Sequence, residues 1–219
     1  MIKLKTLKTP LGNEVSFWGE QKIAPQHVLF LIGGFHGDEP EGPYLLERFI
    51  DLYQSRNCCS GYDIYVVPCL NPDGAALKKR ENAHNVDLNR NYPTHNFKSE
   101  SFNPHTGTAQ SGTPGSEIET QWLMGLVEAY RPKQIISIHS DLKVVDFDGP
   151  AEDWAKQIAV LTGYPLVTNV GYPTPGSFGT WAGIEHHIPV ITLEVDRART
   201  EDELDKLWTK LNPLFQSFL

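Results

Sequence analysis

Basic residues are scarce in this sequence. The 219-residue chain has 19 Lys and Arg against 27 Asp and Glu, which gives a formal net charge of −8. A protein that binds nucleic acid needs a basic face for the phosphate backbone, so this balance argues against a nucleic-acid partner. A small anionic substrate would instead require arginines or lysines that gather at one place.

Cysteine is also rare. There are three cysteines, Cys58, Cys59 and Cys69, and no two of them are spaced as in a zinc knuckle or a redox motif. The odd number favours reduced thiols, as is usual in the cytosol. The absence of an N-x-[ST] sequon agrees with that interpretation.

Long apolar runs are missing as well. No stretch approaches the roughly 20 apolar residues of a membrane span, so we expect no membrane association. The segment from Met1 to Gly12 contains lysines and lacks the apolar core region of a signal peptide. These features predict a protein that works in the cytoplasm.

Short apolar runs rich in β-branched residues do occur, and they predict strands at residues 27–33, 63–67, 134–138 and 190–195. Apolar residues at helical spacing lie between them and predict helices at 41–53, 117–130, 154–161 and 203–214. Residues 2–9 and 14–18 are typical of a hairpin. This alternation predicts an α/β fold, a three-layer α/β/α sandwich with a mixed, mainly parallel twisted sheet. The length favours a single domain over residues 1–219.

Residues 91–115 differ from these elements because they are rich in Asn, Pro, Thr, Ser, Gly and His and nearly free of apolar residues. A loop of this length in a compact domain is usually functional or disordered. It ends at Ser116, and Glu119 follows three residues later. This spacing predicts a capping box that begins the next helix.

Ligands of open α/β sheets bind beyond the carboxyl ends of the strands. The first of the four apolar runs is followed by the sequence HGDE, which contains His36 and Glu39. His139 directly follows the third run, and the fourth contains Glu194 near its end. Two histidines and two glutamates are therefore expected at the edge of the sheet where an active site would form.

His36, Glu39 and His139 together have the composition of a zinc site in hydrolases, in which two histidines and a glutamate leave a fourth position for water. The HxxE spacing alone is a weak signal. A histidine at a strand end is often only hydrogen-bonded, and Glu39 beside Pro40 could be a carboxylate in the first turn of a helix. The joint pattern favours a metal over these alternatives.

A longer pattern surrounds these positions. It comprises HGDE, NPDG at residues 71–74, REN at 80–82, VDLNRN at 86–91, SEIET at 116–120, SIHS at 137–140, GSF at 176–178 and TLE at 192–194. The pattern resembles the zinc carboxypeptidases of the carboxypeptidase A type. This resemblance implies a hydrolase with the carboxypeptidase fold and one Zn²⁺ per chain, held by His36, Glu39 and His139.

The resemblance implies catalytic roles for two further residues. Glu194 matches the general base that moves a proton from the attacking water to the leaving amine. Arg80 matches the arginine that stabilises the developing oxyanion. The alternative for Glu194 is a strand-end carboxylate paired with an arginine such as Arg197. The alternative for Arg80 is a solvated basic run that it forms with Lys78 and Lys79.

Four more residues match substrate-binding positions of the family. Asn89 and Arg90 match the pair that binds the terminal carboxylate of the substrate, a task that suits the guanidinium fork. Tyr172 matches the tyrosine of the active-site lid, although it lies one residue closer to the following Gly-Ser than in the family. Phe178 matches a residue that lines the side-chain pocket. The alternative for Tyr172 is an aromatic residue in a turn, and the alternative for Phe178 is a core phenylalanine. We interpret Asp87 as a structural residue that orients its loop.

The segments DFDGP at residues 146–150 and GYPTPGS at 171–177 resemble the branch of the family that cleaves murein peptides. This narrower resemblance implies a cytoplasmic enzyme of peptidoglycan recycling that hydrolyses the γ-D-glutamyl–meso-diaminopimelate bond. The partner would be a small peptide with a free carboxylate, a murein tripeptide. Diaminopimelate carries an additional ammonium group, for which Asp141, Asp146 and Asp148 are candidate partners. Solvated loop acids are the alternative for these three.

Two other functions stay open. The chain could be a deacylase of N-acyl amino acids, like the aspartoacylase and succinylglutamate desuccinylase relatives, which share HxxE and an arginine-rich site. It could also be an inactive scaffold that binds peptides. The SEIET and GSF segments look more like those of peptidases, and the full set of metal and catalytic residues argues against an inactive scaffold.

Overall fold

The computed structural model describes residues 1–22, 25–56, 60–101 and 109–219. Its main sheet has seven strands in the order β1-β2-β4-β3-β7-β9-β8. They are β1 (Ile2–Lys8), β2 (Glu14–Gly19), β3 (Val28–Gly33), β4 (Asp63–Val67), β7 (Gln134–Ser140), β8 (Val144–Asp148) and β9 (Val190–Val195). The central strands β4, β3, β7 and β9 run parallel, whereas β1, β2 and β8 pair antiparallel to their neighbours. The predicted mixed sheet with a parallel centre is thus confirmed.

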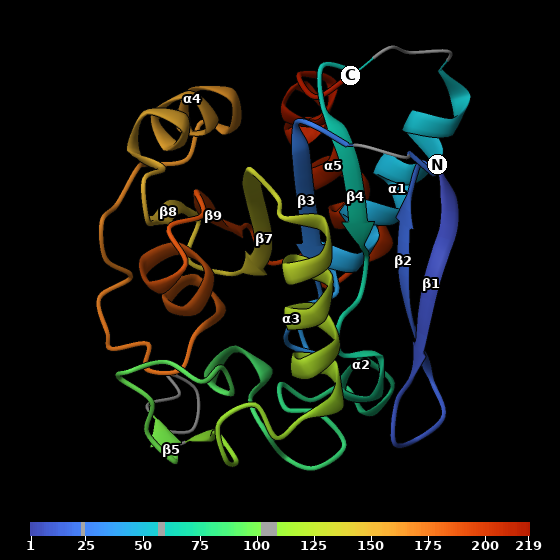
Figure 1. Cartoon of the computed structure of the whole chain (residues 1–219). Helices are drawn as coiled ribbons and strands as arrows, with labels where there is room; N and C mark the ends of the chain where they lie inside the picture. Colours follow the sequence, from blue (N-terminus) through green and yellow to red (C-terminus); the bar gives the residue numbers. More distant parts are fainter. Residues whose placement is uncertain (23–24, 57–59, 102–108) are drawn as a thin grey trace.

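Helices cover both faces of this sheet (Figure 1). On one face, α1 (Glu41–Ser55), α4 (Glu152–Thr162) and α5 (Glu201–Gln216) pack in one hydrophobic cluster. On the other, α3 (Ile118–Tyr130) and a π-helical segment, η2 (Gly179–Glu185), pack in a second cluster. Alternate residues of β3 divide between the two, with Leu29 and Leu31 in the first and Phe30 and Ile32 in the second. The predicted three-layer α/β/α class is therefore confirmed.

No helix among the described residues is both long and apolar enough to cross a membrane. The described cysteine, Cys69, has a free thiol, and burial raises the pKa of this thiol to about 12. Cys58 and Cys59 lie outside the described residues.

Short elements occupy the loops, namely α2 (Pro72–Leu77), the 3₁₀ turn η1 (Leu88–Arg90), and the paired strands β5 (Glu100–Ser101) and β6 (Ala109–Gln110). The long polar loop predicted at residues 91–115 contains β5 and β6, and its residues 102–108 lie outside the described part. Asn91 anchors this loop. Its Nδ2 donates to Ser111 O at 2.6 Å and Thr113 O at 2.9 Å, and its Oδ1 accepts from Glu117 N at 3.1 Å. The loop is therefore tied to the beginning of α3.

The predicted capping box at Ser116 and Glu119 is wrong. The N-cap of α3 is Glu117, and no side chain caps the helix. The Ser116 hydroxyl donates to Glu117 Oε1 at 2.7 Å, and Glu117 Oε2 accepts from Asn82 Nδ2 at 2.8 Å. Glu119 is completely buried. The Ser116 hydroxyl thus pairs with its neighbour Glu117, and the buried Glu119 carboxylate has no hydrogen-bond partner among the described residues.

Candidate metal centre and active site

The carboxyl ends of β3, β7 and β9 meet at one edge of the sheet. The parallel register sets His139 of β7 opposite Glu194 of β9. β3 ends at Gly33 in the same parallel ladder, next to β7. The turn after β3, which contains His36 and Glu39, therefore begins at the edge where His139 and Glu194 lie.

Close packing between two turns fixes the HGDE turn. A Cβ on Gly37 would lie 2.0 Å from the backbone carbon of Gly74 in the NPDG turn, so a larger residue does not fit. Gly37 N donates to Arg80 O at 3.2 Å. Asn71 Nδ2 donates to the same Arg80 oxygen at 3.1 Å and to Phe35 O at 3.3 Å. The backbone that carries the arginine is thereby held against the turn that carries the metal-ligand candidates.

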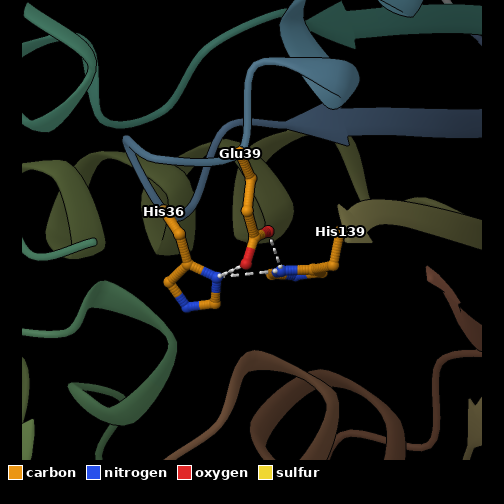
Figure 2. A group of neighbouring side chains, drawn as sticks. All are labelled: His36, Glu39 and His139. Carbon is orange, nitrogen blue, oxygen red and sulfur yellow. Dashed lines mark hydrogen bonds and ion pairs between the residues drawn. The ribbon is translucent and has the colours of Figure 1, made fainter. Parts of the chain in front are cut away.

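The side chains of His36, Glu39 and His139 point toward one another (Figure 2). His36 Nδ1 lies 2.8 Å from Glu39 Oε1, His139 Nδ1 lies 3.1 Å from Glu39 Oε2, and the two Nδ1 atoms are 3.2 Å apart. All three side chains are buried, and one ligand atom from each lies within 4.8 Å of the others. Two imidazole nitrogens and a carboxylate that face one point suit zinc, so this group could hold the ion.

Charges act differently on the three side chains of this group, and Glu39 and Asp87 raise the pKa of His36. Burial would raise the pKa of Glu39, but the His36 and His139 imidazoles hold it well below its usual value. Burial lowers the pKa of His139. An ionised carboxylate and a neutral imidazole are the forms in which these side chains bind a metal.

Asp87 is completely buried and links the metal-ligand candidates to Arg80. Its Oδ1 lies 3.2 Å from His36 Nε2, and its Oδ2 accepts from Arg80 Nε at 3.0 Å. An acceptor at Nε2 holds the imidazole proton there and leaves Nδ1 free for a metal. Asp87 also caps η1 by accepting from Asn89 N at 2.9 Å. The predicted loop-orienting role is therefore only part of what Asp87 does, and no spacing in the sequence indicates its contact with His36.

A cavity of about 180 Å³ opens beside this group. Its lining includes His36, Glu39, His139, Arg80 and Glu194. It also includes six of the seven predicted substrate-binding residues, namely Asn89, Arg90, Asp141, Asp146, Asp148 and Tyr172. The structure thus brings the candidates from distant parts of the sequence around one space.

Arg80 and Arg90 bring positive charge to the cavity. Arg80 Nη1 lies 3.4 Å from Glu39 Oε1. Arg90 is buried, its Nη1 donates to Asn89 O at 2.7 Å, and its Nε has no hydrogen-bond partner within the described residues. Burial lowers the pKa of Arg90. A buried guanidinium with a free donor is a site for an anionic group such as a carboxylate.

Glu194 faces the cavity from β9. Burial and the nearby charge of Glu39 raise the pKa of Glu194 to about 7. Its Oε2 accepts from Leu142 N at 3.4 Å. A carboxyl group that titrates near neutral pH can both accept and release a proton. The alternative pairing with Arg197 is wrong, because Arg197 Nη1 donates to Ser140 Oγ at 3.0 Å instead.

Asp146 and Asp148 belong to β8, a strand that the residue pattern of this segment does not predict. Burial and the Asp148 charge raise the pKa of Asp146 to about 6, and burial raises the pKa of Asp148. Asp146 Oδ1 is buried and has no hydrogen-bond partner in the part of the chain that the structure describes. A Cβ on Gly179 would lie 2.0 Å from Asp148 Oδ2, so the carboxylate occupies space that only a glycine leaves. These two are therefore not solvated loop acids, whereas Asp141 is exposed.

Phe178 does not lie where the resemblance placed it. Its ring is buried in the core, with centroids 5.4 Å from Phe35 and 5.2 Å from Tyr92, and it is absent from the cavity lining. Its backbone N donates to Asn89 Oδ1 at 2.9 Å. The core alternative holds for Phe178, because the neighbouring aromatic rings offer it an apolar site away from the cavity. Tyr172, by contrast, does line the cavity, and burial raises the pKa of its hydroxyl.

These features define a class of protein. A buried His–Glu–His group, a buried arginine and a carboxyl group that titrates near neutrality are the parts of a metal-dependent hydrolase. The family model of the zinc carboxypeptidases matches residues 3–148. The chain belongs to this family and is a hydrolase.

Curated relatives agree with this assignment. Murein peptide amidase A from Escherichia coli K12 is 33% identical over 203 residues, which cover 86% of this chain and 79% of that protein. Murein peptide amidase A from Vibrio campbellii is 34% identical over 208 residues, which cover 91% of this chain and 81% of that protein.

Solved structures are similar as well. The murein-tripeptide amidase from Escherichia coli O157 matches with a TM-score of 0.80 and 32% identity, over 95% of this chain and 89% of that one. Carboxypeptidase A from Helicoverpa armigera matches with a TM-score of 0.78 over 98% of this chain and 67% of that one, and at 16% identity it shows the fold alone.

Asp87→Asn tests the contact between Asp87 and His36. We expect zinc affinity to fall about 10- to 100-fold, because the amide cannot hold both the His36 proton and the Arg80 guanidinium. Competition with a chelator measures the zinc Kd. Asp73→Asn is the matched control, since Asp73 is equally buried but accepts from Thr9 Oγ1 and Asn13 Nδ2 away from the cavity. Equal zinc affinity in the Asp87 variant and wild type would contradict the assigned role.

Proposed function

We propose that this hydrolase cleaves the γ-D-glutamyl–meso-diaminopimelate bond of murein peptides with the help of one zinc ion. The observation that carries the proposal is the charge pattern of the cavity. Arg90 brings a guanidinium and Asp146 a carboxyl group to one lining, and each has a buried side-chain atom without a hydrogen-bond partner among the described residues. Diaminopimelate at the carboxyl end of a peptide carries carboxylates and a free ammonium, so it complements both.

His36, Glu39 and His139 would hold the zinc ion, which supplies Lewis-acid polarisation of the scissile carbonyl and acidifies water. Glu194 takes a proton from the attacking water, which its raised pKa allows near neutral pH, and passes it to the leaving amine. Arg80 donates to the oxygen on which negative charge develops. Asp87 keeps the guanidinium of Arg80 in place for that task.

Substrate recognition divides between the two charged regions of the cavity. Arg90 and Asn89 bind the carboxylate beside the scissile bond, with Arg90 buried to strengthen the attraction. Asp146, assisted by Asp148, accepts from the side-chain ammonium of diaminopimelate. Asp141 lies at the exposed part of the lining and Tyr172 covers the bound residue.

We further propose that residues 1–219 act as one catalytic domain. The cytoplasmic location expected from the sequence stays a prediction. A deacylase of N-acyl amino acids is less well supported, because such a substrate leaves the Asp146 carboxylate without a cation. A non-catalytic peptide-binding scaffold gives no reason for the perturbed pKa of Glu194.

Three substrates distinguish these functions. We expect the zinc-loaded protein to release diaminopimelate from L-Ala-γ-D-Glu-meso-diaminopimelate, and to leave an ordinary C-terminal L-peptide and an N-acyl amino acid uncleaved. Chromatography of the amines released measures all three. Cleavage confined to the N-acyl amino acid would establish the deacylase instead, and cleavage of none would support the scaffold.

Glu194→Gln tests the general base. We expect kcat to fall about 100- to 10,000-fold while zinc content stays at the wild-type level, because the amide cannot accept the proton from water. Steady-state kinetics and elemental analysis of the same sample measure the two quantities. Asp51→Asn, which neutralises an exposed carboxylate of α1 outside the cavity lining, is the control and should keep kcat within a few-fold of wild type. Near-full activity in the Glu194 variant would remove this residue from the mechanism.

The pH dependence of KM tests Asp146. Asp146 is ionised above a pH of about 6 and neutral below it, since its pKa is raised to about 6. We therefore expect KM for the diaminopimelate peptide to rise about tenfold as the pH falls from 7.5 to 5, because a charge-assisted hydrogen bond is lost. The control substrate ends in 2-aminopimelate, which lacks the ammonium, and the ratio of the two KM values isolates Asp146 from Glu194. A KM ratio that does not change with pH would contradict the assignment of Asp146 to the ammonium. So would a KM ratio whose pH dependence is the same in Asp146→Asn as in wild type.

A further inference from the structure

Glu41 is a buried charged residue that neither binds the metal in our proposal nor lines the cavity. It is the first residue of α1, it follows Glu39 by two positions, and its side chain is completely inaccessible to solvent. A buried carboxylate is costly unless hydrogen bonds satisfy it. The partners that satisfy Glu41 therefore indicate what the residue holds in place.

Those partners lie on the other two segments that build the site. Glu41 Oε2 accepts from Ser140 Oγ at 2.9 Å, and Ser140 follows His139 at the end of β7. Glu41 Oε1 accepts from Ala198 N at 2.6 Å, in the segment that follows Glu194 at the end of β9. One carboxylate thus joins the HGDE turn to both strand ends.

Two more contacts close this network. Ser140 N donates to Glu39 Oε2 at 3.3 Å, and Arg197 Nη1 donates to Ser140 Oγ at 3.0 Å. The Ser140 hydroxyl therefore gives its single proton to Glu41 and uses its oxygen to accept from Arg197. The orientation of every group in the network is determined by its neighbours.

We propose that Glu41 is a positioning residue that sets the distance between the His36–Glu39 turn, His139 and Glu194. Small displacements of groups that act together on one substrate cost rate out of proportion to their size. The part of this proposal that concerns turnover rests on the proposed function. The part that concerns the metal-ligand candidates does not, because zinc binding can be measured without a substrate.

Glu41→Gln tests the proposal, since the carbonyl oxygen of glutamine can keep one of the two hydrogen bonds while its NH₂ group opposes the other donor. We expect the zinc Kd to rise about 10- to 100-fold. We also expect kcat for the diaminopimelate peptide to fall at least tenfold with KM within about twofold of wild type, because the cavity residues that bind substrate are untouched. Chelator competition and steady-state kinetics measure these effects.

Asp73→Asn is the matched control. Asp73 is also completely buried, and its carboxylate also accepts from a hydroxyl, Thr9 Oγ1 at 2.6 Å, and from a backbone N–H, Leu11 N at 3.1 Å, but these partners lie away from β7 and β9. If Glu41 only stabilised the fold, both variants would lower the melting temperature and leave the zinc Kd unchanged, and the proposal would be wrong. It would also be wrong if the two variants weakened zinc binding equally.

Ser140→Ala removes the hydrogen bond from Ser140 Oγ to Glu41 Oε2 while Glu41 itself is kept. This variant tests the same contact if Glu41→Gln does not fold. We expect it to weaken zinc binding, and the Glu41→Gln, Ser140→Ala double variant to be less affected than the sum of the two single effects. Wild-type zinc affinity in Ser140→Ala, or strictly additive effects, would count against the network. Should the wild-type protein cleave none of the substrates, the proposed function fails while the zinc measurements still decide the role of Glu41.

Discussion

Charge buried at the carboxyl edge of the sheet is the constraint on which the rest of the site depends. Glu39, Asp87 and Arg80 are at most 9% exposed. Buried charges are costly unless they are paired and hydrogen-bonded. Here the charged groups pair with one another. Arg80 contacts the carboxylates of Glu39 and Asp87, and Asp87 also contacts His36. This arrangement requires the turns that follow β3 and β4 to pack tightly against each other, which explains why Gly37 and Gly74 lie in contact.

Two residues of the cavity lining, Arg90 and Asp146, also carry side-chain atoms that stay unpaired among the described residues. Arg90 Nε and Asp146 Oδ1 are buried without partners among the described residues, and each such group costs roughly 1–3 kcal/mol. A substrate that brings a carboxylate to Arg90 and an ammonium to Asp146, both of which line the cavity, would pair these two charged side chains on binding. A substrate that lacks either group would leave one of them buried and unpaired. Selectivity for a substrate residue with both a carboxylate and an ammonium would therefore have two sources. One is the new contacts, and the other is the free energy lost when Arg90 or Asp146 stays unpaired.

The sequence predicts the centre of the sheet and the β1–β2 hairpin at one edge, but it misses β8 at the other edge. β3, β4, β7 and β9 are short apolar runs between helices, and their strand ends carry the metal-ligand candidates and Glu194. β8 escapes prediction because two aspartates interrupt its apolar pattern and its pairing with β9 forms only in the folded chain. Asp87 and Phe178 show the same limit in the site. The contact between Asp87 and His36, and the burial of Phe178 among other rings, arise from tertiary packing that residue spacing does not encode.

X-ray absorption at the zinc edge of the loaded protein tests most directly whether zinc binds to His36, Glu39 and His139. We expect two imidazole ligands, light oxygen ligands and no sulfur. We also expect His139→Ala to lose one imidazole contribution and most of its bound zinc. A sulfur ligand, which would point to a cysteine, or an unchanged imidazole signal in the His139 variant would contradict the metal centre from which the proposed chemistry follows.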